Sequence, residues 1–133
     1  MTAKARVVAA LIPHPVEPQR YLVQQRLPGK SRALLWEFPG GKVESGETDQ
    51  AALARECWEE LAVRLEVLDL VATAVHGYPD LEVELVLYRS RIAGGEPRAL
   101  GANELRWASI AEMKALPFCA ADLPLIEALD SRA

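Results

Sequence analysis

The sequence has only two cysteines among its 133 residues, Cys57 and Cys119, and they lie far apart in the chain. Neither forms a metal-binding pair with a neighbouring cysteine, which excludes a zinc site of that kind. We interpret both as reduced thiols of a cytoplasmic protein, with a disulfide as the less favoured alternative. The two histidines, His14 and His76, are also isolated, and no partner residue near them indicates catalysis.

The sequence also lacks an excess of basic residues. Its formal net charge is −4 and its pI is about 5.2, which disfavours binding to duplex nucleic acid because that role needs a basic face. An anionic small molecule stays compatible with this charge, because a bound metal ion can invert the charge of a site. We therefore expect a small-molecule partner and no nucleic acid.

Long apolar runs are missing as well. The apolar run within residues 1–15 is too short to span a bilayer, and its β-branched pattern suits a strand. No clear signal-peptide cleavage site follows it, so we expect no membrane partner and a cytoplasmic location. Neither internal repeats nor linker-like segments occur, so residues 1–133 are expected to form one domain, either as a monomer or as a homodimer.

Hydrophobic patterns predict several strands and two principal helices. Strands are expected at residues 5–12, 20–26, 65–78, 81–92 and 104–110. The first two of these strands are compatible with a hairpin, and residues 27–36 are expected to form a loop. Helices are expected at residues 48–62, near Ala111 and at residues 121–132. Together these elements predict an α/β (α+β) sandwich.

The first predicted helix carries an unusual number of carboxylates. At roughly 100° per residue, Glu56, Glu59 and Glu60 share one arc of the helix and are expected to point outward. The opposite side is expected to be buried, and it holds Ala51, Ala54, Cys57, Trp58, Leu61 and Ala62. Three carboxylates at this spacing suit Mg²⁺ or Mn²⁺. Taken alone, however, such a face is more often a solvated surface, with Arg55 and Arg64 as partners.

The segment before the helix favours the metal site over the solvated surface. Gly40 and Gly41 directly follow Phe38 and Pro39, and a short loop leads from them into the acidic helix. Paired glycines allow a bare backbone to approach a ligand or an ion. A glycine carbonyl could therefore join the carboxylates around one metal ion.

The combined pattern resembles the Nudix box. Gly41 is followed after five residues by Glu47, and after seven more by the segment 55–63, which reads RECWEELAV. The flanking segments WEFPGGKVE, LRWASIAEM and ADLPLIEAL are similar to the MutT branch of this family. Within that branch, the chain is most similar to bacterial nucleoside-triphosphate pyrophosphohydrolases, including those that act on CTP or oxidised dGTP.

The resemblance implies a fold, a reaction and a set of residue roles. The fold is a Nudix α/β/α sandwich with a mixed sheet between helices, and the reaction is hydrolysis of a nucleoside triphosphate to the monophosphate and pyrophosphate. Roles in metal binding and catalysis are implied for Glu56, Glu59 and Glu60, with the carbonyl of Gly40 as a further metal ligand. A structural pair is implied for Glu47 and Arg55. Substrate-binding positions are implied for Arg26, Glu37, Phe38, Pro39, Gly40, Gly41 and Asp122.

The chain departs from the family pattern at three positions. Ala62 replaces a glycine, so the helix is expected to end in a different, unstrained backbone conformation. Gly101 stands where MutT enzymes often carry a glutamate, with Glu104 nearby but out of register. Asp122 stands where the best-known oxidised-guanine enzyme has asparagine, and this residue does not decide which base is bound. Two alternatives stay open: a substrate in which a nucleoside diphosphate is linked to another moiety such as ADP-ribose, or a catalytically silent nucleotide-binding module.

Overall fold

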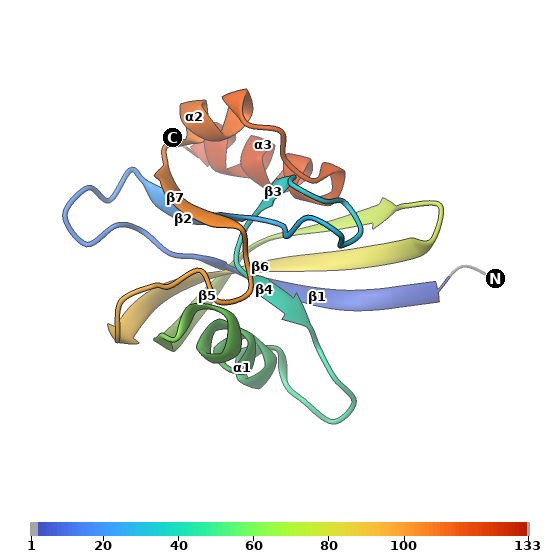
Figure 1. Ribbon diagram of the computed structural model, residues 1–133, viewed down its shortest axis with the longest axis horizontal. Helices are drawn as coiled ribbons and strands as arrows, with labels where there is room; N and C mark the ends of the chain where they lie inside the picture. Colours follow the sequence, from blue (N-terminus) through green and yellow to red (C-terminus); the bar gives the residue numbers. More distant parts are fainter. Residues whose placement is uncertain (1–2, 133) are drawn as a thin grey trace.

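A computed structural model describes residues 3–132, which fold into two β-sheets between helices on either side (Figure 1). The four-stranded sheet has the order β4-β1-β6-β5 and consists of β4 (Gly40–Lys42), β1 (Ala3–Leu11), β6 (Leu81–Gly94) and β5 (Arg64–Gly77). The three-stranded sheet has the order β3-β2-β7 and consists of β3 (Trp36–Glu37), β2 (Tyr21–Gln25) and β7 (Glu104–Ala108). Helix α1 (Asp49–Leu61) lies on one side, and α2 (Ile110–Ala115) and α3 (Leu123–Arg132) lie on the other. This arrangement confirms the predicted mixed sandwich.

The strand connections correct one prediction and complete another. Strand β1 pairs in parallel with β6 and antiparallel with β4, so both of its edges are occupied and the predicted hairpin with β2 does not form. Only an isolated bridge between Pro13 and Tyr21 links the two segments. Strands β5 and β6, both predicted from the sequence, form a long antiparallel pair. The short strands β3 and β4, on either side of Pro39, were not predicted because two or three residues show no periodicity.

Side-chain alternation along β1 divides the interior into two cores. Val8, Ala10 and Ile12 pack toward α1, whereas Ala9 and Leu11 belong to the core that α2 and α3 cover. Because successive side chains of a strand point to opposite faces, one buried strand serves both layers. No helix within residues 3–132 has the length and apolar character needed to cross a membrane.

Helix α1 is rotated relative to the prediction. The hydroxyl of Thr48 caps it by accepting the Ala51 N–H at 3.1 Å. Its buried residues are Ala52, Leu53, Cys57 and Leu61. Trp58, which was expected to pack, is 61% exposed. The buried arc is therefore centred closer to Glu56 and Glu60 than a simple division into acidic and apolar sides predicts, so those two side chains point inward.

Candidate active site

A cavity of about 630 Å³ opens between β1, the N-terminal end of β4, α1, the loop after β2 and the short 3₁₀ turn Ala120–Asp122. Most of the residues singled out from the sequence line it: Arg26, Glu37, Phe38, Gly40, Gly41, Glu56, Glu60 and Asp122. Pro39, Glu47, Arg55 and Glu59 lie outside this lining. The fold thus brings together four segments that are far apart in the chain.

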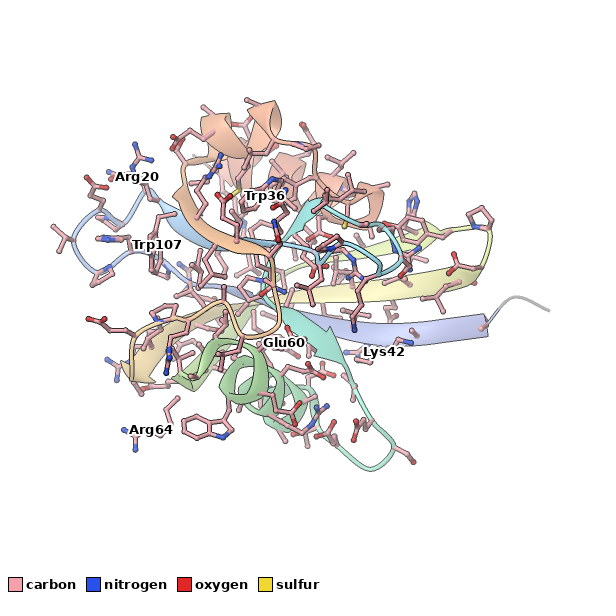
Figure 2. The ribbon with its side chains drawn as sticks, in the orientation of Figure 1. Arg20, Trp36, Lys42, Glu60, Arg64 and Trp107 are labelled. Atoms are coloured by element: carbon pink, nitrogen blue, oxygen red, sulfur yellow. The ribbon has the colours of Figure 1, made fainter. Side chains whose placement is uncertain are left out.

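Glu56 and Glu60 of α1 line one side of the cavity, and Glu59 lies beside them on the same helix, outside the lining. These three residues are here called the acidic wall. In Figure 2, Glu60 lies between α1 and the strands, whereas Arg64 lies on the outer side of the molecule. The alternative ion pair between Glu60 and Arg64 is not among those formed within residues 3–132. Instead, the Glu60 carboxylate accepts a hydrogen bond from the amide of Gln24 at 3.5 Å.

The two glycines before the helix make room for the acidic wall. A Cβ atom on Gly41 would lie only 2.5 Å from Oε2 of Glu56, so any other residue there would displace that carboxylate. Gly40 has a φ of 155°, and a Cβ there would overlap the carbonyl oxygen of Val8. Both positions therefore require glycine, one for a close approach to Glu56 and the other for the β1–β4 contact.

Burial and mutual repulsion disfavour the charged forms of the acidic wall. Burial, and after it the neighbouring charge of Glu56, raises the pKa of Glu60 to about 7. Burial likewise raises the pKa of Glu56, although its hydrogen bond with Arg55 opposes the shift. A cation placed among these oxygens would relieve both effects.

Arg55 is the present partner of the acidic wall. Its guanidinium donates to Glu47 through Nε at 2.8 Å and Nη2 at 2.9 Å, which ties the loop before the helix to the helix itself. Nη1 also donates to Glu56 at 2.9 Å and to Glu59 at 3.5 Å. The hydrogen bonds that Arg55 donates to Glu47 lower the pKa of Glu47 to about 2. Glu47 and Arg55 thus lie together, as the resemblance implies.

The acidic wall fits a divalent cation by its chemistry. Carboxylates and a main-chain carbonyl are the hard oxygen ligands that Mg²⁺ and Mn²⁺ prefer. Within residues 3–132, however, no three His, Cys, Asp or Glu side chains already converge on one point. Glu56 and Glu59 are turned toward Arg55 and Glu60 toward Gln24, so binding an ion requires modest side-chain rotation.

A second wall of the cavity is formed by Arg26, Glu37, Phe38 and Asp122. Arg26 and Glu37 form an ion pair at 3.0 Å. Oδ2 of Asp122 accepts the main-chain N–H of Phe38 at 3.0 Å. Burial raises the pKa of Asp122 to about 8, so its carboxyl is largely protonated at neutral pH and can donate a hydrogen bond.

Two further side chains, Tyr78 and Arg32, reach the cavity. Tyr78, at the tip between β5 and β6, lines the cavity, and its hydroxyl accepts the Ala121 N–H at 3.0 Å. The guanidinium of Arg32 lies 4.1 Å from the centre of the Tyr78 ring and pairs with Asp80 at 3.4 Å. Because these partners are more than 40 positions apart in the chain, no local pattern could have joined them.

Comparison with known proteins agrees with this geometry. The NUDIX domain family model matches residues 8–128. A Mycobacterium tuberculosis protein named putative 8-oxo-dGTP diphosphatase 2 is 43% identical over 108 residues, covering 76% of this chain and 72% of that protein. A CTP pyrophosphohydrolase of Escherichia coli is 35% identical over 122 residues, covering 92% and 88%. The solution structure of the E. coli ORF135 protein superposes with a TM-score of 0.83 at 33% identity, covering 99% and 93%.

Proposed function

Because the chain belongs to the Nudix family, we propose that it is a Mg²⁺-dependent hydrolase that converts a nucleoside triphosphate to the monophosphate and pyrophosphate. Mn²⁺ is a plausible replacement for Mg²⁺ on chemical grounds. The observation that carries the proposal is a single cavity of about 630 Å³ that joins inward-facing carboxylates to a buried hydrogen-bonding wall. Such a cavity suits one ligand with a polyphosphate at one end and a base at the other.

The residues of the acidic wall would have different roles in the reaction. When bound, a divalent ion neutralises the polyphosphate and acidifies a water molecule. Glu59, Glu60 and the carbonyl of Gly40 would hold the ion. Glu56, which is half-buried and has a raised pKa, is our choice for the general base that accepts the proton of the attacking water. Because no nucleophile motif occurs in the sequence, hydrolysis proceeds by positioning and charge neutralisation.

The second wall would recognise the base. Phe38 offers an aromatic ring beside the cavity, and stacking on such a ring tolerates different bases. Protonated Asp122 can donate to a base carbonyl while its other oxygen stays bonded to Phe38. The names of the relatives support either an oxidised or otherwise modified dNTP, or CTP and dCTP. Removal of damaged nucleotides from the pool is the corresponding role.

Several assignments stay predictions within this proposal. They are the single domain over residues 1–133, the cytoplasmic location and the choice between monomer and homodimer. Two rival functions also remain to be tested: cleavage of a nucleoside diphosphate linked to another moiety, and nucleotide binding without catalysis. The retention of Glu56, Glu59 and Glu60 argues against the silent binding module.

A product assay separates these functions. The protein is incubated with Mg²⁺ and CTP, dCTP, oxidised dGTP, 5-methyl-dCTP or ADP-ribose, and the products are identified by chromatography. Release of pyrophosphate is expected, with kcat falling about 10³-fold in Glu56→Gln because the general base is lost. Glu127→Gln, on the exposed face of α3, is the matched control and should keep full activity.

The same assay can overturn the proposal. A predominance of sugar phosphate would favour the rival substrate. If the wild type and Glu56→Gln were equally inert on every nucleotide, the binding module would be favoured instead.

A further inference from the structure

Gln24 lies between the two walls of the cavity and contacts both. It is a residue of β2 and is only 2% exposed. Its side-chain Nε2 donates to Oε2 of Glu37 at 3.1 Å and faces Oε2 of Glu60 at 3.5 Å. One amide group therefore bridges a carboxylate of the second wall and a carboxylate of the acidic wall.

The same side chain carries a polar atom without a partner. Oε1 of Gln24 is buried and accepts no hydrogen bond from any residue in 3–132. Leaving a buried carbonyl unsatisfied is costly, and an apolar residue of similar shape would avoid that cost. Leu22 and Val23, the preceding residues of β2, are apolar and fully buried. The presence of a glutamine at this buried position therefore points to a role other than stability.

Packing alone does not fix the carboxylate of Glu60. Gly101 lies close to the aliphatic part of the side chain, so that a Cβ added there would lie 2.8 Å from Cγ of Glu60. Beside the carboxylate, however, lies a second cavity of about 80 Å³ lined in part by Gln24, Glu37 and Glu60. Because this space leaves the carboxylate room to turn, its direction depends on the hydrogen bond from Gln24.

We propose that Gln24 is a positioning residue that orients Glu60 for metal binding and couples it to Glu37 on the second wall. The inference rests on the proposed function, in which Glu60 is a metal ligand and Glu37 contributes to substrate binding. When the base binds, a shift of Glu37 moves the side-chain amide of Gln24, and this movement changes the orientation of Glu60. Metal affinity and base discrimination are therefore linked through one buried residue.

The neighbouring glutamine provides a matched control. Gln25 has both polar groups satisfied: Nε2 donates to the carbonyl of Leu34 at 3.1 Å, and Oε1 accepts from Asn103 at 2.7 Å. Strand alternation points it away from Gln24, and it lines neither cavity. A methionine at position 24 or 25 keeps the length of the side chain and removes the amide.

The test compares Gln24→Met with Gln25→Met. Mn²⁺ binding is measured by electron paramagnetic resonance without nucleotide, and kcat/KM is measured for CTP and oxidised dGTP. In Gln24→Met we expect about tenfold weaker Mn²⁺ binding, as for the loss of other partners of metal ligands, and at least about a threefold change in the ratio of the two kcat/KM values. The thermal midpoint should be unchanged or raised, because the substitution removes the buried Gln24 carbonyl that has no hydrogen-bond partner. Gln25→Met should leave Mn²⁺ affinity and the ratio unchanged.

Three results would overturn the inference: wild-type Mn²⁺ affinity in folded Gln24→Met, an unchanged kcat/KM ratio, or an equal loss of affinity in Gln25→Met. If Gln24→Met fails to fold, Gln24→Leu serves in its place. A wild type that is inert on every nucleotide would defeat the proposed function alone, because the Mn²⁺ titration needs no substrate.

Discussion

Two carboxylates of the acidic wall, Glu56 and Glu59, are hydrogen-bonded to Arg55 of their own helix. Asp122 in the second wall is instead hydrogen-bonded to the main chain of a distant segment. Arg55 contacts Glu47, Glu56 and Glu59 through long side chains that can rotate. Asp122 is buried beneath the cavity and accepts from the Phe38 N–H. The acidic wall thus has partners that can be exchanged, whereas Asp122 in the second wall is held by the main chain.

This difference matches what each wall would have to do. A wall that takes up a cation has to rearrange its charges, so partners that can be exchanged are an advantage. A wall that discriminates between bases benefits from hydrogen-bonding groups whose orientation is fixed before the base binds. A wrong base then leaves one of these groups unpaired, which costs binding free energy. Substitutions in the two walls should therefore differ in the property they change, cation binding or base recognition, as well as in the size of the effect.

After the loss expected for Glu56→Gln, the next largest effect is expected in the second wall. Asp122→Ala should lower kcat/KM about 10²-fold, because it removes the hydrogen bond to the base and leaves the Phe38 N–H without its acceptor. Asp122→Asn is the matched control: its carbonyl can accept from Phe38 and its amide can donate, as protonated Asp122 does. Steady-state kinetics at pH 7 should show activity near the wild type in Asp122→Asn. A 10²-fold loss there as well would contradict the protonated carboxyl.

The same pair of variants gives a pH test. Since the pKa of Asp122 is raised to about 8 in the folded protein, the folded state holds a proton that the unfolded state releases near pH 4. The contribution of Asp122 to the free energy of unfolding therefore falls as the pH rises from about 4 to about 8. At pH 9 Asp122→Asn should be more stable than the wild type by more than about 1 kcal/mol, measured by urea denaturation. At pH 4 the difference should disappear.

A smaller effect is expected where the loop before β7 meets the acidic wall. A Cβ on Gly101 would lie 2.8 Å from Cγ of Glu60, so Gly101→Ala should push Glu60 aside and lower kcat about tenfold. Because the close atoms include Cβ and Cγ of Glu60 and not only the free end of its side chain, the stability should also fall, by about 1 kcal/mol or more. Gly77→Ala is the control, since no atom lies within 4 Å of a Cβ there. Equal activities of the two alanine variants would show that Glu60 tolerates the displacement.

The acidic wall could be predicted from the sequence because its residues lie on one helix with fixed spacing. The Glu47–Arg55 contact was implied only by the family resemblance, and the close approach of Gly41 to Glu56 was not predicted. The second wall was reached only through the family resemblance, because Arg26, Phe38 and Asp122 come from three separate segments. Gln24 was not predicted by either route. Its burial between two carboxylates depends on how β2 packs against α1, which no local pattern encodes.

The strand pairing and the end of α1 show the same limit. The predicted β1–β2 hairpin was reasonable from adjacent strands, but β6 and β4 occupy both edges of β1. The prediction that Ala62 would avoid a strained conformation was also wrong. Ala62 has φ 59° and ψ 34°, in the left-handed region. Tertiary contacts impose this geometry: the loop after β6 donates the Arg98 N–H to the carbonyl of Leu61 and the Leu100 N–H to that of Glu60.

The smallest effect tests how the end of the acidic helix is held. A left-handed conformation costs alanine about 1 kcal/mol or more and costs glycine little, so Ala62→Gly should stabilise the protein by about 0.5–1 kcal/mol. The catalytic constants should not change, because the Ala62 N–H already closes the helix on the carbonyl of Trp58 at 3.1 Å. Ala54→Gly, inside the same helix, should instead destabilise by about 1 kcal/mol. Urea denaturation of the three proteins measures both changes. If both glycines were destabilising to the same degree, the loop contacts and not the backbone conformation would determine how α1 ends, and the acidic wall would be anchored from outside its own helix.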